Sequence, residues 1–116
     1  MLIGQTVFIP ASGSPGVQYH GPWMPRQGNS FTGAMEILKA SSSGWTFKCS
    51  VETKNAEDPD SAAVGIGSAI AMTAAGTQTE SYTGCLELVR YVFDGLGAGT
   101  DRWIHYRMNP PIWQPN

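Results

Sequence analysis

The chain has little charge. Asp, Glu, Lys and Arg make up 14% of its 116 residues, whereas an average soluble domain has about a quarter. The seven Lys and Arg residues are scattered, so no basic stripe can neutralise phosphates, and we expect no nucleic-acid binding. Ser, Thr, Gly, Asn and Gln fill the surface instead. Such a surface is typical of proteins that pack against one another, because few charges are desolvated on contact.

Cysteine is also scarce. Cys49 and Cys85 are the only two, which is too few for a disulfide scaffold. Cys49 lies in the apolar phase of a predicted strand, so we expect a small buried hydrophobic side chain there. Cys85 also falls inside a predicted strand. A disulfide between the two forms only if their strands face each other.

Long apolar runs are missing. The window 64–75 is apolar, but it is short and rich in Gly and Ala, so we expect no membrane span. The first ten residues have neither the basic start nor the apolar stretch of a signal peptide, so no secretion signal is expected.

Clusters that carry chemistry are lacking too. His20 and His105 are the only imidazoles, and neither stands beside acids or Cys at ligand spacing, so we expect no metal, no cofactor and no enzyme activity. The acids at 57, 58 and 60 lack the spacing of a calcium loop and predict a solvated loop. Glu36 and Glu52 are expected to oppose each other across a hairpin, on an ordinary charged outer surface.

Period-2 alternation is the main pattern that is present. The runs 31–39 and 45–52 alternate on either side of SSSG and predict a hairpin, and 85–94 and 103–108 predict a second one. The run 85–94 is apolar on both faces, which predicts a central or covered strand. Further strands are expected at 2–9, 17–20, 67–73 and 77–82. A helix within 61–75 is the alternative to the strand at 67–73, but its two glycines each disfavour a helix by about 1 kcal/mol.

These strands predict one domain, residues 1–116, folded as an all-β antiparallel sandwich. We expect a jelly-roll-like arrangement of about eight strands, because short strands recur between Gly-rich turns. Residues 1–28 form a partly irregular arm, in which Pro22 and Pro25 prevent regular pairing. Residues 109–116 form an extended tail that continues no sheet but carries Trp113, so the tail is expected to lie against a surface.

Aromatic residues flanked by Pro or polar residues are the best interaction candidates. Trp and Tyr can anchor a protein interface or stack on sugars. The predicted partner interface comprises Tyr19, Trp23, Arg26, Trp103, His105, Arg107, Ile112 and Trp113. For Trp113, capping the end of the core is a competing interpretation. A sugar site would instead use Tyr19, Trp23, Trp103 and Tyr106.

The C-terminal part of the chain resembles small β-sandwich virion structural proteins of tailed phages, of the capsid decoration or cement type. The resemblance rests on Leu88–Tyr91, on Trp103, His105 and Arg107, on Pro110, Pro111 and Trp113, and on Ala71–Gly76. The loop 95–102 and the Pro-rich part before Asn29 have no counterpart.

This resemblance implies a non-enzymatic protein located in the virion, which is assembled in the host cytoplasm. Its implied partners are the major capsid protein, whose neighbouring subunits it would stabilise, and further copies of itself. The alternative is a carbohydrate-binding β-sandwich module of the adhesin type, with a glycan as ligand.

Overall fold

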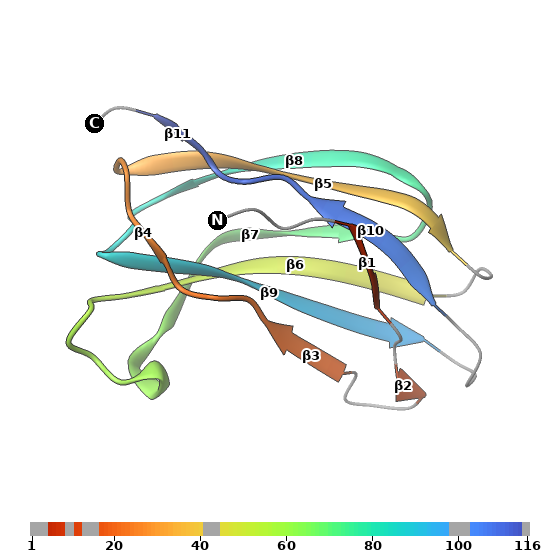
Figure 1. Cartoon of the computed structure of the whole chain (residues 1–116), viewed down its shortest axis with the longest axis horizontal. Coiled ribbons are helices and arrows are strands. Elements are labelled where there is room, and N and C mark those ends of the chain that lie inside the picture. The colour runs from red at the N-terminus through yellow and green to blue at the C-terminus, as the bar shows by residue number, and fades with distance from the viewer. Residues whose placement is uncertain (1–4, 9–10, 13–16, 41–44, 98–102, 115–116) are drawn as a thin grey trace.

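The computed structural model describes residues 5–8, 11–12, 17–40, 45–97 and 103–114, and in this part of the chain nearly all regular structure is β (Figure 1). A single turn of 3-10 helix lies at Asp60–Ala62. The strands are β1 (Gln5–Phe8), β2 (Ala11–Ser12), β3 (Val17–His20), β4 (Met24–Pro25), β5 (Ser30–Ala40), β6 (Trp45–Lys54), β7 (Val64–Met72), β8 (Gly76–Thr83), β9 (Leu88–Gly97), β10 (Ile104–Met108) and β11 (Ile112–Gln114).

The strands form two sheets that pack face to face. Sheet A has the order β1-β10-β5-β8, with the short β11 also on β5. Sheet B has the order β3-β9-β6-β7, with the short β2 and β4 also on β9. Of the eight principal strands, only β6 and β7 are both consecutive in sequence and neighbours in a sheet. This is the strand order of a jelly roll. The predicted antiparallel sandwich is therefore confirmed, and within the described residues only the β2–β9 pair is parallel.

Both predicted hairpins are wrong. β5 and β6 exist where the alternation placed them, but β5 belongs to sheet A and β6 to sheet B. The same holds for β9 in sheet B and β10 in sheet A. Alternation fixes which face of a strand is buried and does not fix which strand lies beside it. The expected turn at 41–44 lies outside the described residues. Of the expected loop 95–102, residues 95–97 belong to β9 and the rest lies outside the described residues.

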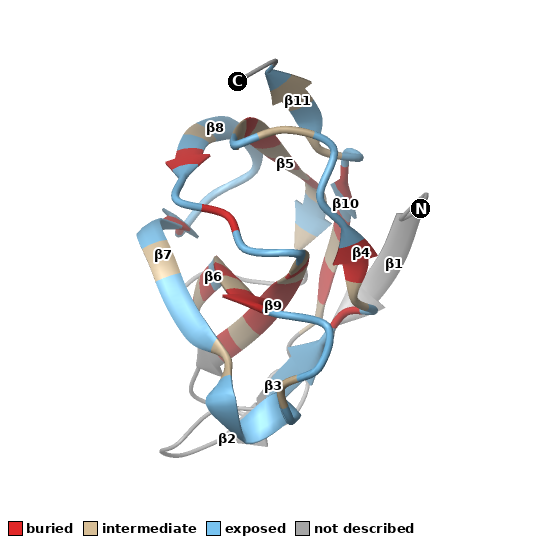
Figure 2. Cartoon of the chain, turned by 90° about the vertical axis from the view of Figure 1, so that its left-hand side faces the viewer, coloured by how far each residue is buried: buried red, intermediate tan, exposed pale blue. Residues whose placement is uncertain are grey.

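The core lies between the two sheets, whose strands carry the buried residues coloured red in Figure 2. It is rich in aromatic rings. Tyr106 of β10 contacts Phe47 of β6 and Phe93 of β9, with ring centroids 4.7 and 5.0 Å apart. These contacts join one sheet to the other, and each such pair adds about 0.5–1.5 kcal/mol beyond the area it buries. As predicted, β9 is a central strand, since it lies between β6 and the β3 edge.

Both cysteines are buried. Cys49 lies in the core, as expected. Cys85 was predicted to lie inside a strand, but it precedes β9, which begins at Leu88. Both thiols are free, so the two cysteines do not form a disulfide with each other.

The expected strands at 67–73 and 77–82 are confirmed as β7 and β8, and no helix forms there. β7 bulges where its register on β6 shifts between Cys49 and Val51. Gly67 in this bulge has φ +67°, and a Cβ on it would lie 2.6 Å from Cδ1 of Tyr82. Glycine is therefore needed at this position for two reasons, the backbone angle and the buried ring.

Two segments pair that were expected not to. Met24–Pro25 forms β4 on β9, despite the flanking prolines. Ile112–Gln114 forms β11 on β5, so the tail does continue a sheet. Pro110 and Pro111 precede β11, so they remove no donor from its ladder. The first strand was predicted at 2–9, and the structure describes β1 within it, at Gln5–Phe8.

In the described part of the chain, no helix is long and apolar enough to cross a membrane.

Candidate interaction surface

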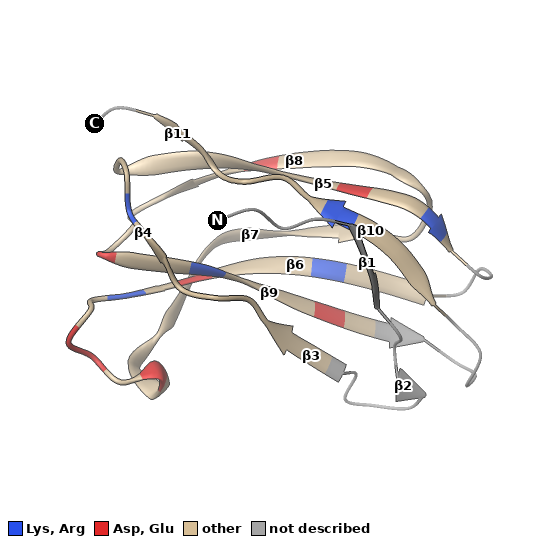
Figure 3. Cartoon of the chain, viewed as in Figure 1, with Lys and Arg blue, Asp and Glu red and all other residues tan. Residues whose placement is uncertain are grey.

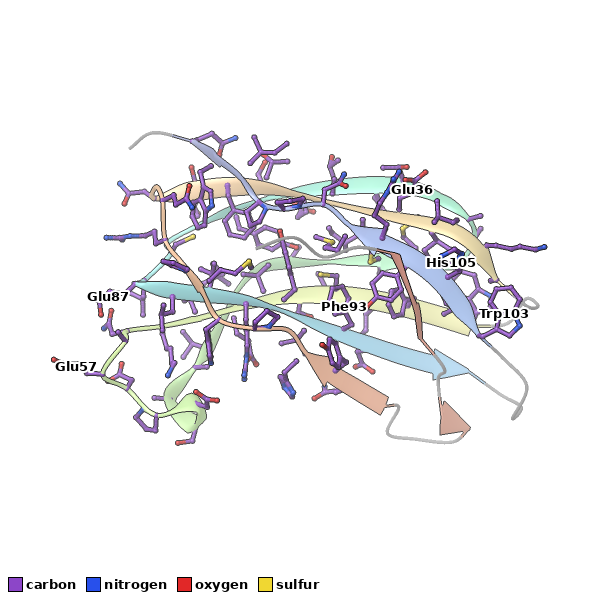
Figure 4. All side chains as sticks on the ribbon, viewed as in Figure 1. Glu36, Glu57, Glu87, Phe93, Trp103 and His105 are labelled. Atoms are coloured by element: carbon purple, nitrogen blue, oxygen red, sulfur yellow. The ribbon has the colours of Figure 1, made fainter. Side chains whose placement is uncertain are left out.

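The residues predicted to form one interface are distributed over separate parts of the molecule. His105, Arg107 and Ile112 lie on the outer face of sheet A, because their strand neighbours Tyr106, Met108 and Trp113 point inward. Figure 4 shows Trp103 and His105 at the end of the sandwich opposite to Glu57 and Glu87. The structure therefore brings together only part of the predicted set.

The other predicted residues have different surroundings. Tyr19 of β3 is 55% exposed and stacks on Phe93 with a centroid distance of 6.3 Å. Trp113 packs on Phe31 at 4.9 Å, which confirms its core-capping interpretation. Arg26 is held by its Nη1, which donates to the Cys85 carbonyl at 2.9 Å.

The outer face of sheet A carries a hydroxyl ladder that the sequence interpretation missed. In the register of β5 and β8, Thr83 lies opposite Ser30 and Ser81 lies opposite Thr32. Thr79 and Thr77 continue the same row along β8. We call these residues the hydroxyl face: Ser30, Thr32, Thr77, Thr79, Ser81 and Thr83. The alternation of Thr and Ser with other residues in GTQTESYT, the sequence of β8, could have predicted this row.

Gln114 of β11 fastens the C-terminal tail to the hydroxyl face. Its Oε1 accepts a hydrogen bond from Ser30 Oγ at 3.1 Å, and its Nε2 donates to Thr32 Oγ1 at 3.1 Å. Thr32 Oγ1 in turn lies 3.3 Å from Ser81 Oγ. Beside this network, Ile112 is 62% exposed on the same face. The face thus combines ordered hydroxyl groups with one exposed apolar side chain.

Among the residues that the structure describes, charge on this face is confined to one end. Arg107 forms an ion pair with Glu36 there, and Lys39 lies beyond them on β5 (Figure 3). The expectation that Glu36 and Glu52 oppose each other is wrong, because their strands lie in different sheets. Glu52 instead accepts from Arg90 Nε at 2.9 Å. Both acids are neutralised by arginine. The Glu36–Arg107 pair is the more exposed of the two, and exposed pairs stabilise a fold by about 0–1 kcal/mol.

Trp23 lies in a charged cluster on the outer face of sheet B. Its ring is 4.3 Å from the guanidinium carbon of Arg90 and 5.1 Å from the Lys54 ammonium. Its Nε1 donates to Asp60 Oδ1 at 3.1 Å. Asp60 also pairs with Lys54 at 3.1 Å. The cluster therefore fixes the loop between β6 and β7 onto the sheet.

This loop is mostly exposed, as the sequence predicted, and Asp60 is in addition held by neighbouring side chains. The hydrogen bond from Lys54, with further help from Trp23 and Arg90, lowers the pKa of Asp60 below its ordinary value. Ala56 N donates to Glu87 Oε1 at 2.8 Å, which ties down the start of the same loop. These contacts are structural, since each charge is satisfied by a neighbour.

The four rings of the alternative sugar site do not form a platform. Tyr106 is only 1% exposed, so its predicted stacking on a sugar is wrong. Trp23 and Trp103 lie on different sheets, since Trp23 covers Arg90 of β9 while Trp103 leads into β10. A flat arrangement of all four rings is excluded by this placement.

The buried ionisable groups stay protonated at neutral pH. Burial raises the pKa of the Cys49 thiol, and burial followed by the proximity of Cys49 raises the pKa of the Tyr82, Tyr91 and Tyr106 hydroxyls. Among the residues that the structure describes, no group of three His, Cys, Asp or Glu side chains could hold a metal ion. The geometry thus offers surfaces for contact.

Comparison with protein families, with curated proteins and with solved structures finds no match for this chain.

Proposed function

We propose that this chain is a non-enzymatic structural subunit of a virus particle, a capsid decoration protein that stabilises neighbouring subunits of the major capsid protein. The observation that carries the proposal is the outer face of sheet A, with its hydroxyl face, its exposed Ile112 and its charge confined to one end. A partner covering the centre of this face desolvates few charges.

The fold supports the proposal without deciding it. Jelly rolls occur in viral capsid proteins and also in lectins, so topology alone does not assign a function. The resemblance of the C-terminal part to phage decoration proteins favours the capsid role. Repetition of one weak contact over a symmetric lattice would multiply its strength, so each contact can be modest.

A matched pair of lysine substitutions tests which face meets the coat. Ile112 on sheet A is 62% exposed and Val64 on sheet B is 53% exposed, and both are branched aliphatic residues on strands. We expect Ile112→Lys to weaken co-sedimentation of the purified chain with coat particles by about tenfold, because it places an unpaired charge in the contact. Val64→Lys should leave binding unchanged.

Three outcomes contradict the proposal. Wild-type chain that fails to co-sediment with coat particles overturns the capsid role, and equal binding by both variants overturns the assignment to sheet A. Specific binding of one sugar on a glycan array, with quenching of Trp fluorescence, would support the carbohydrate-binding alternative instead.

A further inference from the structure

The edge strands on the two sides of the sandwich differ in length and in proline and charge content. On one side, β3 is followed by the two-residue strand β4 and by Pro22 and Pro25. Short strands and prolines are common means of blocking unwanted edge pairing. On the other side, β7 and β8 are nine and eight residues long and contain no Lys, Arg or Pro. Figure 3 shows a single acidic band on β8, at Glu80, and no charge on β7.

Of these two strands, β8 is the unprotected one. β7 is interrupted by the bulge at Gly67, and bulges twist an edge away from a partner. β8 pairs with β5 over eight consecutive residues without a register shift. Within the described residues β8 pairs with β5 alone, and most of its residues are exposed. β7 lies close to β8 on this side, but among the described residues no strand pairs with the outer edge of β8, so its regular row of backbone groups has no strand partner there.

We infer that β8 pairs antiparallel with β8 of a second copy of this chain, about a two-fold axis at Thr79. The two copies of sheet A would then form one continuous sheet. An edge that pairs with itself in this way closes a dimer, because both subunits use the same residues. The inference rests on the proposed function for its setting, since it supplies a self-contact to the assembling subunit.

The sequence of β8 is complementary to itself in this register. Thr79 meets Thr79 of the second copy, and Thr77 meets Ser81, so the outer-face pairs nearest the axis are all hydroxyl pairs. On the inner face Glu80 meets Gln78, whose amide can donate to the carboxylate. A register centred on Glu80 would place two carboxylates directly opposite each other, which is unfavourable. This match argues for a second copy as the occupant of the edge.

Opposite charges at one position test the register. We expect wild-type protein to show a concentration-dependent monomer–dimer equilibrium in sedimentation velocity. Gln78→Glu should weaken the dimer at least tenfold, because each added carboxylate faces Glu80 of the second copy. Gln78→Lys, the matched control, should keep or tighten the dimer at low salt and lose that gain at high salt. Wild-type protein that stays monomeric, or two variants that dimerise equally, would overturn the inference.

Crosslinking gives a second measurement that does not depend on affinity. Under mild oxidation, Thr79→Cys should form a disulfide-linked dimer rapidly, because residue 79 faces itself across the axis. Thr83→Cys, on the same strand face, should not, since it faces residue 75 of the second copy. Cys49 and Cys85 are buried and do not compete. Equal crosslinking at both positions would contradict the register.

This experiment separates the inference from the proposed function. A chain that dimerises through β8 but does not bind coat particles contradicts only the capsid role. A chain that binds coat particles but is unaffected by Gln78→Glu contradicts only the self-pairing. Far-UV circular dichroism and the melting temperature of each variant, compared with wild type, exclude unfolding as the cause of any loss.

Discussion

Replacing Gly67 by Ala should destabilise the fold far more than replacing Gly84 by Ala. Both glycines have positive φ, +67° and +77°, so both substitutions carry the backbone cost of about 1–2 kcal/mol for a left-handed L-residue. At Gly84 nothing lies within 4 Å of the new Cβ, so that cost stands alone.

At Gly67 the added methyl group meets a buried ring. Its carbon would lie 2.6 Å from Cδ1 of Tyr82, well inside the usual carbon–carbon contact of about 3.5–4.0 Å. Tyr82 is fully buried and stacks on Phe31 with a centroid distance of 5.2 Å, so the ring has no open space to move into. Overpacking of this kind costs about 1–3 kcal/mol. The total for Gly67→Ala is therefore about 2–5 kcal/mol, a large part of the stability of a domain this size.

Urea denaturation followed by Trp fluorescence measures both free energies of unfolding. We expect the free energies of unfolding of the two variants to differ by at least about 1 kcal/mol, with Gly67→Ala the less stable. In a Tyr82→Leu background the extra loss should shrink, because the Cδ1–Cβ clash is removed. Equal losses for Gly67→Ala and Gly84→Ala would refute the packing of β7 against Tyr82.

Three further substitutions probe the tail, the charged cluster and the core. Trp113→Ala should lower the free energy of unfolding by about 1–2 kcal/mol, since a half-buried ring leaves Phe31; an unchanged thermal melt would contradict the docking of β11. Asp60→Asn should destabilise the protein at pH 7. Because the pKa of Asp60 is lowered in the fold, this difference should disappear in urea titrations as the pH falls through that lowered pKa; a difference that persists in strong acid would contradict the ion pairs. Tyr91→Phe should be neutral or stabilise by about 1 kcal/mol, because the buried Tyr91 hydroxyl lacks a hydrogen-bond partner among the described residues; a clear loss in the same assay would show that the hydroxyl is satisfied.

Local patterns in the sequence predicted which residues are buried. The alternation of Trp45, Phe47, Cys49 and Val51 identified the inner face of β6, and the apolar character of both faces of 85–94 predicted the central or covered strand that is β9. These features depend only on the period of a strand, which the sequence carries directly.

Strand neighbours and long-range contacts were not predictable in the same way. A short Gly-containing link between two alternating runs fits a hairpin and equally a crossing between sheets, which is why β5 and β6 were paired wrongly. The cluster around Trp23 brings together residues from four separate segments, and no local sequence pattern predicts contacts between distant segments. Likewise, the position of β8 at the edge of sheet A follows from the strand order of the whole sheet, which the sequence of β8 alone does not contain.

A cryo-electron microscopy reconstruction of virus particles assembled in cells that express this chain would show directly whether the chain decorates a capsid. We expect jelly-roll density at symmetry-related positions on the capsid, with the outer face of sheet A against the coat and Ile112 inside the contact. Particles that carry no copy of the chain, or copies that meet the coat through sheet B, would contradict it.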